Sequence, residues 1–300
     1  MADGKAFAIS DYLNEVAEHS NGKRGYHCSG KVGDYTVCLF GNGLYLQGSL
    51  AKYYLPSNLY TLTRSDTEKA IQSLCDKLHT DIRAAKVSRL DVSTVLPTTR
   101  PPTDYYTGLI NKTYFTRVQA TKDTLYFNSG KRQLVFYDKS KEAVAKGAII
   151  PDCFKGCNLL RYEMRLQRQI PKQLKVTGVI TAERLYNPDF YTTLIGLWKN
   201  EFDSIKKIET PKAIMANIKN PKDAEKAFYA MLLNKEQDGQ SAIDCFLDDL
   251  KAAKVFKDRK YYTRTKERLN KMLQSNGEQQ QSELMKELER AIRDIARYAR

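Results

Sequence analysis

One stretch of the sequence, NLLRYEMRL at residues 158–166, alternates apolar and polar side chains over nine residues. In a β-strand, side chains two residues apart point to the same face of the sheet. The apolar face takes Leu160, Tyr162, Met164 and Leu166, and the charged face takes Arg161, Glu163 and Arg165. The pattern predicts a half-buried strand with one face toward a core and the other carrying charge.

Two further stretches alternate in the same way. The first is VSRLDVSTVL, residues 87–96, in which one face takes Leu90, Val92 and Leu96 and the other takes Arg89 and Asp91. In RQLVFYDK, residues 132–139, Leu134 and Phe136 separate from Val135, Tyr137 and Lys139. If the three strands share a sheet, their polar side chains share a face. Such a face would gather Asp91, Tyr137, Lys139 and Glu163, with Glu142 at the start of the next element turning toward them.

An ordinary solvated face of a half-buried sheet shows the same alternation, so that interpretation stays open at this point. The overall charge bears on the choice. The chain has 300 residues with 49 Lys plus Arg against 35 Asp plus Glu, a net charge of +14. Such a surplus favours a polyanionic partner, and the 19 tyrosines suit single-stranded nucleic acid. The alternative is a basic protein with no such partner.

Carboxylates repel phosphate unless a divalent cation lies between them. A cluster of Asp and Glu side chains on a protein that binds a polyanion therefore predicts a metal site. Oxygen ligands without His or Cys select a hard ion, so we expect Mg²⁺ or Mn²⁺.

The chain changes character near residue 180. Residues 25–180 mix short strands with one helix, for which Ser65 and Glu68 form a candidate capping box. Beyond this part, the pattern predicts helices at residues 189–206, 221–235, 240–255, 258–274 and 282–300. We expect an α+β fold, with an antiparallel sheet and flanking helices over residues 1–205 and a helical domain over 206–300.

The predicted helical domain is basic. Residues 251–300 contain 14 Lys plus Arg and 7 Asp plus Glu. The candidate DNA-binding side chains here are Lys257, Arg259, Lys260, Arg264 and Lys266. They fit a helical pair that grips duplex DNA, or else a solvated helix face. The apolar stripe of the last helix, Leu284, Leu288, Ile292 and Ile295, fits a dimer seam or a docking face.

The chain shows no apolar run of the ~18 residues that a transmembrane helix needs, so we expect no membrane partner. Its N-terminus lacks the pattern of a secretory signal, and its six cysteines are scattered. Reduced thiols and a cytoplasmic location are the expectation.

Three motifs occur in order: Ser88-Arg-Leu-Asp91, Tyr137-Asp-Lys-Ser-Lys-Glu142 and Leu160-Arg-Tyr-Glu-Met-Arg165. They resemble the RLD, Y-x-K-x-x-E and R-[FY]-E motifs of rolling-circle replication initiators, nearest to the gene II/X replication proteins of filamentous phages and related plasmids. The resemblance covers about residues 35–205.

The resemblance implies a DNA nickase and strand transferase with the antiparallel-sheet core of the HUH superfamily. Tyr137 matches the nucleophile that forms a 5′-phosphotyrosyl link and frees a 3′-hydroxyl. Asp91, Glu142 and Glu163 match the acidic positions expected to hold the divalent ion. The family's partners are origin DNA, single-stranded or supercoiled, and a host helicase and polymerase; a homodimer is a further expectation.

The HUH superfamily commonly uses a His-hydrophobe-His pair, and His19, His27 and His79 form no such pair here. The resemblance to the gene II-like group implies that carboxylates hold the metal ion in place of the histidine pair. At neutral pH only about one phenol in a thousand is ionised. Lys139 is expected either to favour the phenolate or to neutralise phosphate oxygens.

The roles of Arg89, Arg161 and Arg165 stay open, because arginines beside carboxylates either contact phosphate or hold the carboxylates in place. Two alternatives to a replication initiator also stay open. One is a non-enzymatic DNA-binding regulator, in which the carboxylates are scattered. The other is a conjugative relaxase with the same chemistry.

Overall fold

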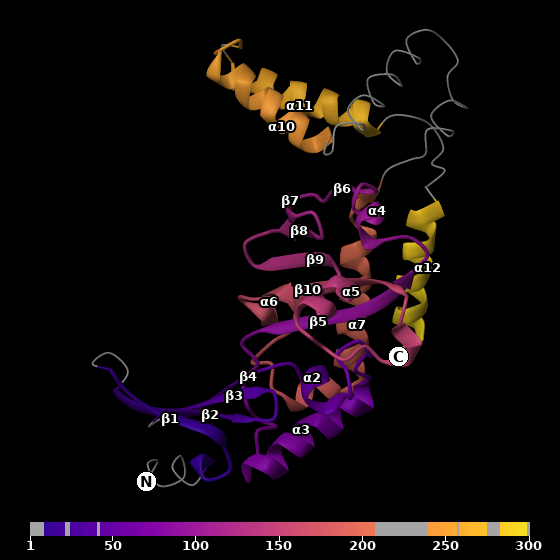
Figure 1. Cartoon of the computed structure of the whole chain (residues 1–300). Coiled ribbons are helices and arrows are strands. Elements are labelled where there is room, and N and C mark those ends of the chain that lie inside the picture. Colours follow the sequence, from indigo (N-terminus) through magenta and orange to yellow (C-terminus); the bar gives the residue numbers. More distant parts are fainter. Residues whose placement is uncertain are drawn as a thin grey trace.

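A computed structural model describes residues 9–21, 25–40, 43–207, 239–256, 258–274 and 283–298 of the chain. Antiparallel sheets with flanking helices come first and helices follow, so the predicted α+β class is confirmed (Figure 1). The N-terminal sheet has the order β1-β2-β3-β4: Asn14–Asn21, Gly25–Val32, Tyr35–Phe40 and Gly43–Gln47. The five-stranded sheet has the order β5-β10-β9-β8-β7: Leu90–Thr98, Asn158–Leu166, Arg132–Asp138, Thr124–Asn128 and Thr116–Thr121. A two-stranded pair joins β6, Leu109–Asn111, to β11, Lys206–Lys207.

The helices lie between and around these sheets. The α-helices of the first part are α2 Leu50–Tyr54, α3 Arg64–Leu78, α4 Pro102–Tyr106, α5 Lys139–Ala145, α6 Ile170–Leu174 and α7 Pro188–Asp203. Two short 3₁₀ turns are η1 Asp152–Phe154 and η2 Glu183–Tyr186. The last part contains α10 Gly239–Ala252, α11 Arg259–Gln274 and α12 Glu283–Tyr298. No helix among the described residues is long and apolar enough to cross a membrane.

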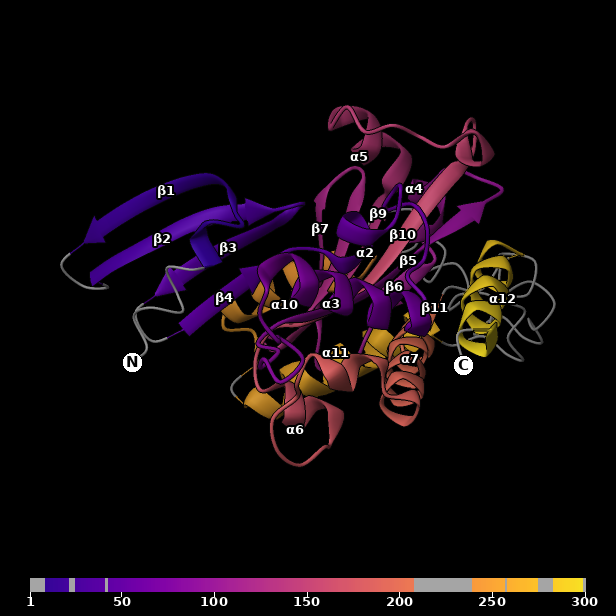
Figure 2. The same ribbon diagram turned by 90° about the horizontal axis from the view of Figure 1, so that it is seen from below.

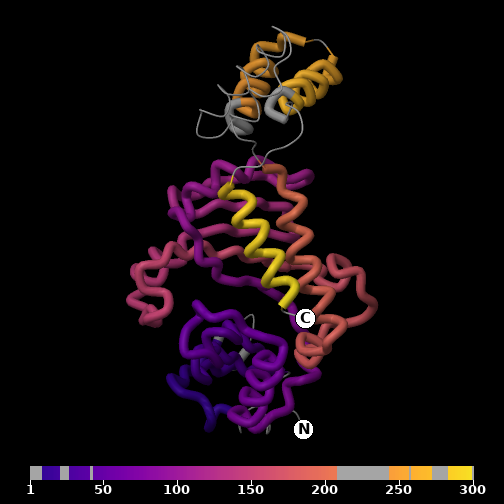
Figure 3. Tube along the Cα trace, turned by 90° about the vertical axis from the view of Figure 1, so that its right-hand side faces the viewer, coloured from indigo at the N-terminus to yellow at the C-terminus, as the bar shows by residue number. Residues whose placement is uncertain are grey.

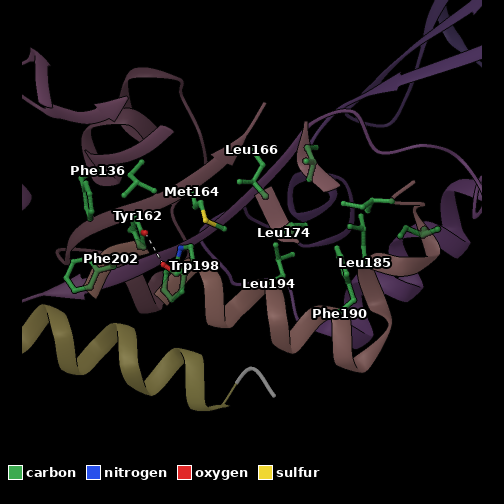
Figure 4. Close-up of a cluster of buried hydrophobic side chains, with 14 of the residues drawn as sticks. Phe136, Tyr162, Met164, Leu166, Leu174, Leu185, Phe190, Leu194, Trp198 and Phe202 are labelled. Atoms are coloured by element: carbon green, nitrogen blue, oxygen red, sulfur yellow. Dashed lines mark hydrogen bonds between the residues drawn. The ribbon is translucent and has the colours of Figure 1, made fainter. Parts of the chain in front are cut away.

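The strand that opened the sequence analysis, β10, lies inside the five-stranded sheet between β5 and β9. Its apolar side chains are buried as the alternation predicts, and they face α7 (Figure 4). Tyr162 stacks on Phe136 at 4.7 Å between ring centroids and donates a hydrogen bond to the Trp198 carbonyl oxygen at 3.0 Å. The helix thus fixes which face of the sheet is the core face, and the opposite face remains for polar side chains.

Two local predictions need correction. The helix α3 begins at Arg64, and its capping box uses Thr63 and Asp66, two residues before the predicted Ser65 and Glu68. Thr63 fits because its side chain accepts from the Asp66 backbone while Asp66 accepts in return. The strand expected within residues 87–96 is β5, which begins at Leu90 and runs through Pro97 to Thr98. Proline is tolerated there because β5 is an edge strand.

The C-terminal helix α12 packs on the core beside α7 (Figure 3). Its buried side chains Met285, Leu288 and Ile292 join the same hydrophobic cluster as the sheet and α7. Glu287 accepts hydrogen bonds from the Tyr105 hydroxyl at 2.7 Å and the Thr99 backbone at 2.9 Å. The apolar stripe of this helix is a docking face, one of its two predicted uses.

The helices α10 and α11 pack against each other around a small cluster of their own, Ile243 and Leu247 with Leu250 and Leu269. Their bounds agree with the predictions for residues 240–255 and 258–274. The helix predicted at residues 221–235 lies outside the described residues.

The N-terminal sheet lies beside the five-stranded sheet at the N-terminal end of the molecule (Figure 2). Along β3 and β4, burial alternates strictly from residue to residue. Val37 and Leu39 join the hydrophobic cluster that includes Ile71 and Leu74 of α3. Within the described part of the chain, the hydrophobic cluster therefore covers one side of the N-terminal sheet and leaves the other side open.

Candidate active site

Three strands of the five-stranded sheet bring their polar side chains onto one face. Residues directly opposite each other on paired strands share a face. Across β10, Arg161 lies opposite Tyr137, Glu163 lies opposite Ser93 and Val135, and Arg165 lies opposite Asp91 and Gln133. We call this set the polar face: Asp91, Ser93, Gln133, Val135, Tyr137, Arg161, Glu163 and Arg165. The prediction that the three strands form one sheet with a common polar face is confirmed.

Glu163 lies at the centre of the polar face and is only 7% exposed. The Tyr137 hydroxyl donates a hydrogen bond to its Oε1 at 3.0 Å, and Nε of Arg161 lies 2.9 Å from the same oxygen. Arg165 donates to Oε2 from Nε at 2.8 Å and from Nη2 at 2.6 Å. A buried carboxylate needs such partners, because an unpaired charge is costly away from water. Glu163 therefore links the tyrosine to both arginines.

The two arginines are themselves held in place. Arg161 donates from Nη1 to the Asn58 carbonyl oxygen at 2.8 Å and from Nη2 to Ser93 Oγ at 2.7 Å. Arg165 donates from Nη1 to Gln133 Oε1 at 3.0 Å. Of the two open interpretations of these arginines, these contacts favour ion-pair partners that position a carboxylate. Ser93 lies two residues after Asp91 on the same strand, so the alternation alone could have placed it on the polar face. Asn58 lies in a loop that no sequence pattern connects to the site.

Burial raises the pKa of the Tyr137 phenol well above its ordinary value, although the positive charge of Arg161 opposes this effect. Burial alone would also raise the pKa of Glu163, but Arg161 and Arg165 outweigh it and hold that pKa below its ordinary value. At neutral pH the pair is therefore a protonated phenol that donates to an ionised carboxylate.

Lys139 departs from the prediction that it continues the strand. The strand β9 ends at Asp138, whose side chain accepts from the Lys141 backbone at 3.0 Å and caps α5. Lys139 is thus the first residue of a helix, and it is 2% exposed. The reason is the capping preference of Asp, which ends the strand one residue earlier than the alternation indicates.

The Lys139 ammonium pairs with Glu142 at 2.5 Å and lies 6.0 Å from the centre of the Tyr137 ring. Burial lowers the pKa of Lys139, and the hydrogen bond to Glu142 opposes this effect. Glu142 also pairs with Lys146. Burial would raise the pKa of Glu142, but its bonds with Lys139 and Lys146 outweigh it and leave that pKa below its ordinary value.

Asp91 lies at the rim of the polar face. It forms a two-point ion pair with Arg89, from Nε at 3.1 Å and from Nη2 at 2.8 Å. The hydrogen bond with Asp91 is the main cause of a raised pKa for Arg89, and burial opposes this effect.

The three carboxylates expected to hold a divalent ion have the right oxygen chemistry but do not meet in this arrangement. Both oxygens of Asp91, of Glu142 and of Glu163 have basic partners. Within the part of the chain that the structure describes, no three His, Cys, Asp or Glu side chains are grouped closely enough to hold one metal ion.

The predicted DNA-binding side chains of the last part lie on α11, where Arg259, Lys260, Arg264 and Lys266 are exposed. Lys260 pairs with Asp258 at 2.8 Å, and Lys266 pairs with Asp244 of α10 at 2.7 Å. Lys257 lies outside the described residues.

The sheet of this basic α+β protein presents a tyrosine bonded to a buried glutamate, with arginines on both sides. The class of protein follows from the comparison with family models. The model for the N-terminal part of a phage replication-associated protein matches residues 30–186, more than half of the chain. The chain belongs to this family of phage rolling-circle replication initiators. No curated protein matches it.

The matched residues run from β2 to η2 and include every element of the polar face. Family membership indicates a role in the initiation of DNA replication and therefore DNA as a partner.

Proposed function

We propose that this protein is a metal-dependent, site-specific DNA nickase and strand transferase that starts rolling-circle replication, with Tyr137 as its nucleophile. The observation that carries the proposal is the hydrogen bond from the Tyr137 hydroxyl to Glu163 Oε1 at 3.0 Å. It places a buried carboxylate, fixed by two arginines, where it can accept the phenolic proton. A nucleophile within hydrogen-bond reach of an oriented base is the arrangement that covalent catalysis requires.

In the proposed step, Tyr137 Oη attacks a backbone phosphorus and the O3′ atom leaves. The phenolic proton passes to Glu163, which releases it to water, and the departing O3′ takes up a proton from water to become a free 3′-hydroxyl. A 5′-phosphotyrosyl bond replaces the phosphodiester bond, and the reverse reaction reseals a strand without ATP. The chain accordingly lacks the G-x-x-x-x-G-K-[ST] motif of ATP-dependent helicases, so a host helicase and polymerase are the partners we propose.

Lys139 has the position of a fixed positive charge near the nucleophile. Its ammonium is buried, 6.0 Å from the Tyr137 ring, and held by Glu142. A cation in a poorly solvated environment stabilises a nearby negative charge more than it would in water. We therefore assign to Lys139 the stabilisation of the phenolate, in preference to direct contact with DNA phosphate.

The proposed cofactor is Mg²⁺ or Mn²⁺, held by one or two of Asp91, Glu142 and Glu163. Mg²⁺ is commonly bound by one or two carboxylates together with substrate phosphates, so three protein carboxylates are not required. When bound, such an ion would polarise the scissile phosphate as a Lewis acid. The basic partners of these carboxylates would need to rearrange when DNA arrives.

The exposed basic side chains of α11 support a second contact with DNA. Arg259 and Arg264 lie on α11. This helix packs with α10 around a small hydrophobic cluster that is separate from the main core. We propose that residues 206–300 include a module for duplex DNA. Because the apolar stripe of α12 is docked on the core, a homodimer would use another surface of this region.

The test is a nicking assay with supercoiled DNA of the replicon that encodes the protein, with Mg²⁺ or Mn²⁺. Wild-type protein should produce nicked circles joined to protein by a bond that resists detergent. Tyr137→Phe should abolish that adduct. The matched control is Tyr126→Phe, because Tyr126 lies opposite Val135 on the same face, one strand further from Glu163. An adduct undiminished by Tyr137→Phe would contradict the assignment of the nucleophile.

A second candidate is a DNA-binding regulator without enzymatic activity. The observation that favours it is the missing three-carboxylate group among the described residues. It predicts origin binding but no adduct with either ion. A conjugative relaxase would form the same adduct on transfer-origin DNA instead.

A further inference from the structure

The uncovered side of the N-terminal sheet carries aromatic rings. Side chains on this side belong to residues that lie opposite one another across β1 to β4. We call it the outer face: Ala17, His19, His27, Ser29, Lys31, Thr36, Cys38, Phe40, Gly43, Tyr45 and Gln47. Outer faces of half-buried antiparallel sheets are normally polar. On this sheet the polar side chains are accompanied by aromatic rings, of which Tyr45 is 47% exposed. These rings are not members of the described hydrophobic clusters.

Three of these rings form a row across three strands. His19 stacks on His27 at 4.8 Å between ring centroids with an interplanar angle of 22°, and His27 stacks on Phe40 at 5.3 Å and 20°. The spacing matches the distance between neighbouring strands, so each ring stands beside the next on an adjacent strand. The row runs across the strands from β1 to β3, and β4 is the next strand in the sheet.

The row ends at a glycine. Gly43 lies directly opposite Phe40 on β4, where a fourth side chain would continue the stack. Among the residues that the structure describes, a Cβ atom at Gly43 would meet nothing within 4 Å. The next residue on the same face of β4 is Tyr45. A flat group that entered this position would therefore stack on Phe40 and lie next to a second exposed ring.

The N-terminal sheet lies beside the five-stranded sheet, which carries Tyr137 and Asp91 (Figure 2). The family of this chain acts on DNA, and unpaired bases, unlike those of a duplex, present flat faces to a protein.

We propose that the outer face of the N-terminal sheet is a stacking platform for single-stranded DNA, with one base placed over Gly43 against Phe40 and another against Tyr45. The proposal rests on the proposed function, because it assigns this surface to the strand that leads to the scissile phosphate. Sequence-independent binding follows, since every base offers a flat face for stacking.

The binding test uses the full chain with Tyr137→Phe and no divalent ion, so that cleavage plays no part. A fluorescent oligo(dT) of about 20 nucleotides reports affinity by anisotropy. Tyr45→Leu removes one ring, and Gly43→Val fills the open position without removing a ring. Valine suits a strand, so the second variant keeps the fold. The control is Tyr114→Leu, because Tyr114 is 95% exposed between β6 and β7.

Each of the two platform variants should weaken oligo(dT) binding at least about fivefold, the lower end of the effect of one base–aromatic stack. Binding of a blunt duplex of the same length should stay unchanged, and Tyr114→Leu should bind as the parent does. Unchanged oligo(dT) affinity in both variants would overturn the proposal and assign the face to another class of partner. An equal loss for duplex would also overturn it.

The two proposals fail separately. A wild-type protein that forms no adduct would contradict the proposed nickase, while ring-dependent binding in the anisotropy experiment would still establish the platform. An adduct without ring dependence would contradict only the platform.

Discussion

The polar face of the five-stranded sheet and the outer face of the N-terminal sheet differ in how their side chains are held. On the polar face, Glu163 is buried and bonded to Tyr137, Arg161 and Arg165. On the outer face, rings such as Tyr45 are exposed, and the row from His19 to Phe40 is held by stacking. Both faces arise from the same two-residue alternation, so the difference lies in what covers each face.

Burial gives the polar face its chemistry. Loop contacts such as that from Asn58 to Arg161 help to exclude water, so the charges there perturb one another's pKa values. Exposure leaves the outer face free to bind. The comparison therefore predicts that substitutions on the polar face affect stability and reaction together, while substitutions on the outer face affect binding alone.

The largest effect should come from Glu163→Ala. Removing this carboxylate leaves Arg161 and Arg165 buried without their partner, which costs about 3–5 kcal/mol in free energy of unfolding when a buried pair is broken. Tyr45→Leu should change the same free energy by no more than about 0.5 kcal/mol, because its ring is largely exposed. Urea unfolding followed by circular dichroism measures both.

The control for Glu163→Ala is Glu163→Gln, which keeps the size of the side chain and its ability to accept hydrogen bonds. It should recover part of the stability but not the adduct. Equal stability losses for Glu163→Ala and Tyr45→Leu would remove the proposed contrast between the two faces.

The alternation of residues 87–96, 132–139 and 158–166 was enough to predict the five-stranded sheet's polar face. The two-residue alternation predicts the faces correctly because one face of the five-stranded sheet is buried against α7. Alternation also marks β3 as a half-buried strand, but it does not predict the N-terminal sheet as a separate sheet. In β3 the buried side chains are Tyr35, Val37 and Leu39, and they alternate with Thr36, Cys38 and Phe40. The aromatic row of the N-terminal sheet depends on register across three strands, which no single segment reveals.

Contacts between distant segments were the part that the sequence could not provide. The hydrogen bond from Arg161 to Asn58 joins residues that are 103 positions apart. Strand order predicts that Asp91, Glu142 and Glu163 converge, but in the described part of the chain they do not form one group, because each is paired with its own basic side chains. Lys139 was misplaced because the cap at Asp138 competes with strand alternation and ends β9.

A smaller effect should appear in acid and should concern the five-stranded sheet rather than the N-terminal one. Burial would raise the pKa of Glu287, but its bonds with Tyr105 and Thr99 outweigh it and lower that pKa. A lowered pKa contributes stability above the unfolded value near ~4.3, and this contribution is lost as the pH falls through the folded value.

Wild-type protein should therefore lose stability below about pH 4.3 more steeply than Glu287→Gln, by at most ~1.4 kcal/mol per pH unit, the limit for one proton. Hydrogen exchange should show the loss in α12. Identical slopes for the two proteins would show that docking of α12 does not depend on this carboxylate.

Arg89→Gln, at the rim of the polar face, should change stability only slightly. The Arg89 and Asp91 side chains are 55% and 34% exposed, and exposed pairs contribute about 0–1 kcal/mol. If Arg89 contacts the DNA strand between the faces, its loss should weaken oligo(dT) binding and reduce the slope of log K against log salt by about 0.7. The matched control is Arg83→Gln, because Arg83 pairs with Asp81 two residues away in the same manner. Equal loss of oligo(dT) affinity in both variants would show that Arg89 contributes only through the overall charge of the protein. It would contradict a DNA path that joins the two faces at Arg89.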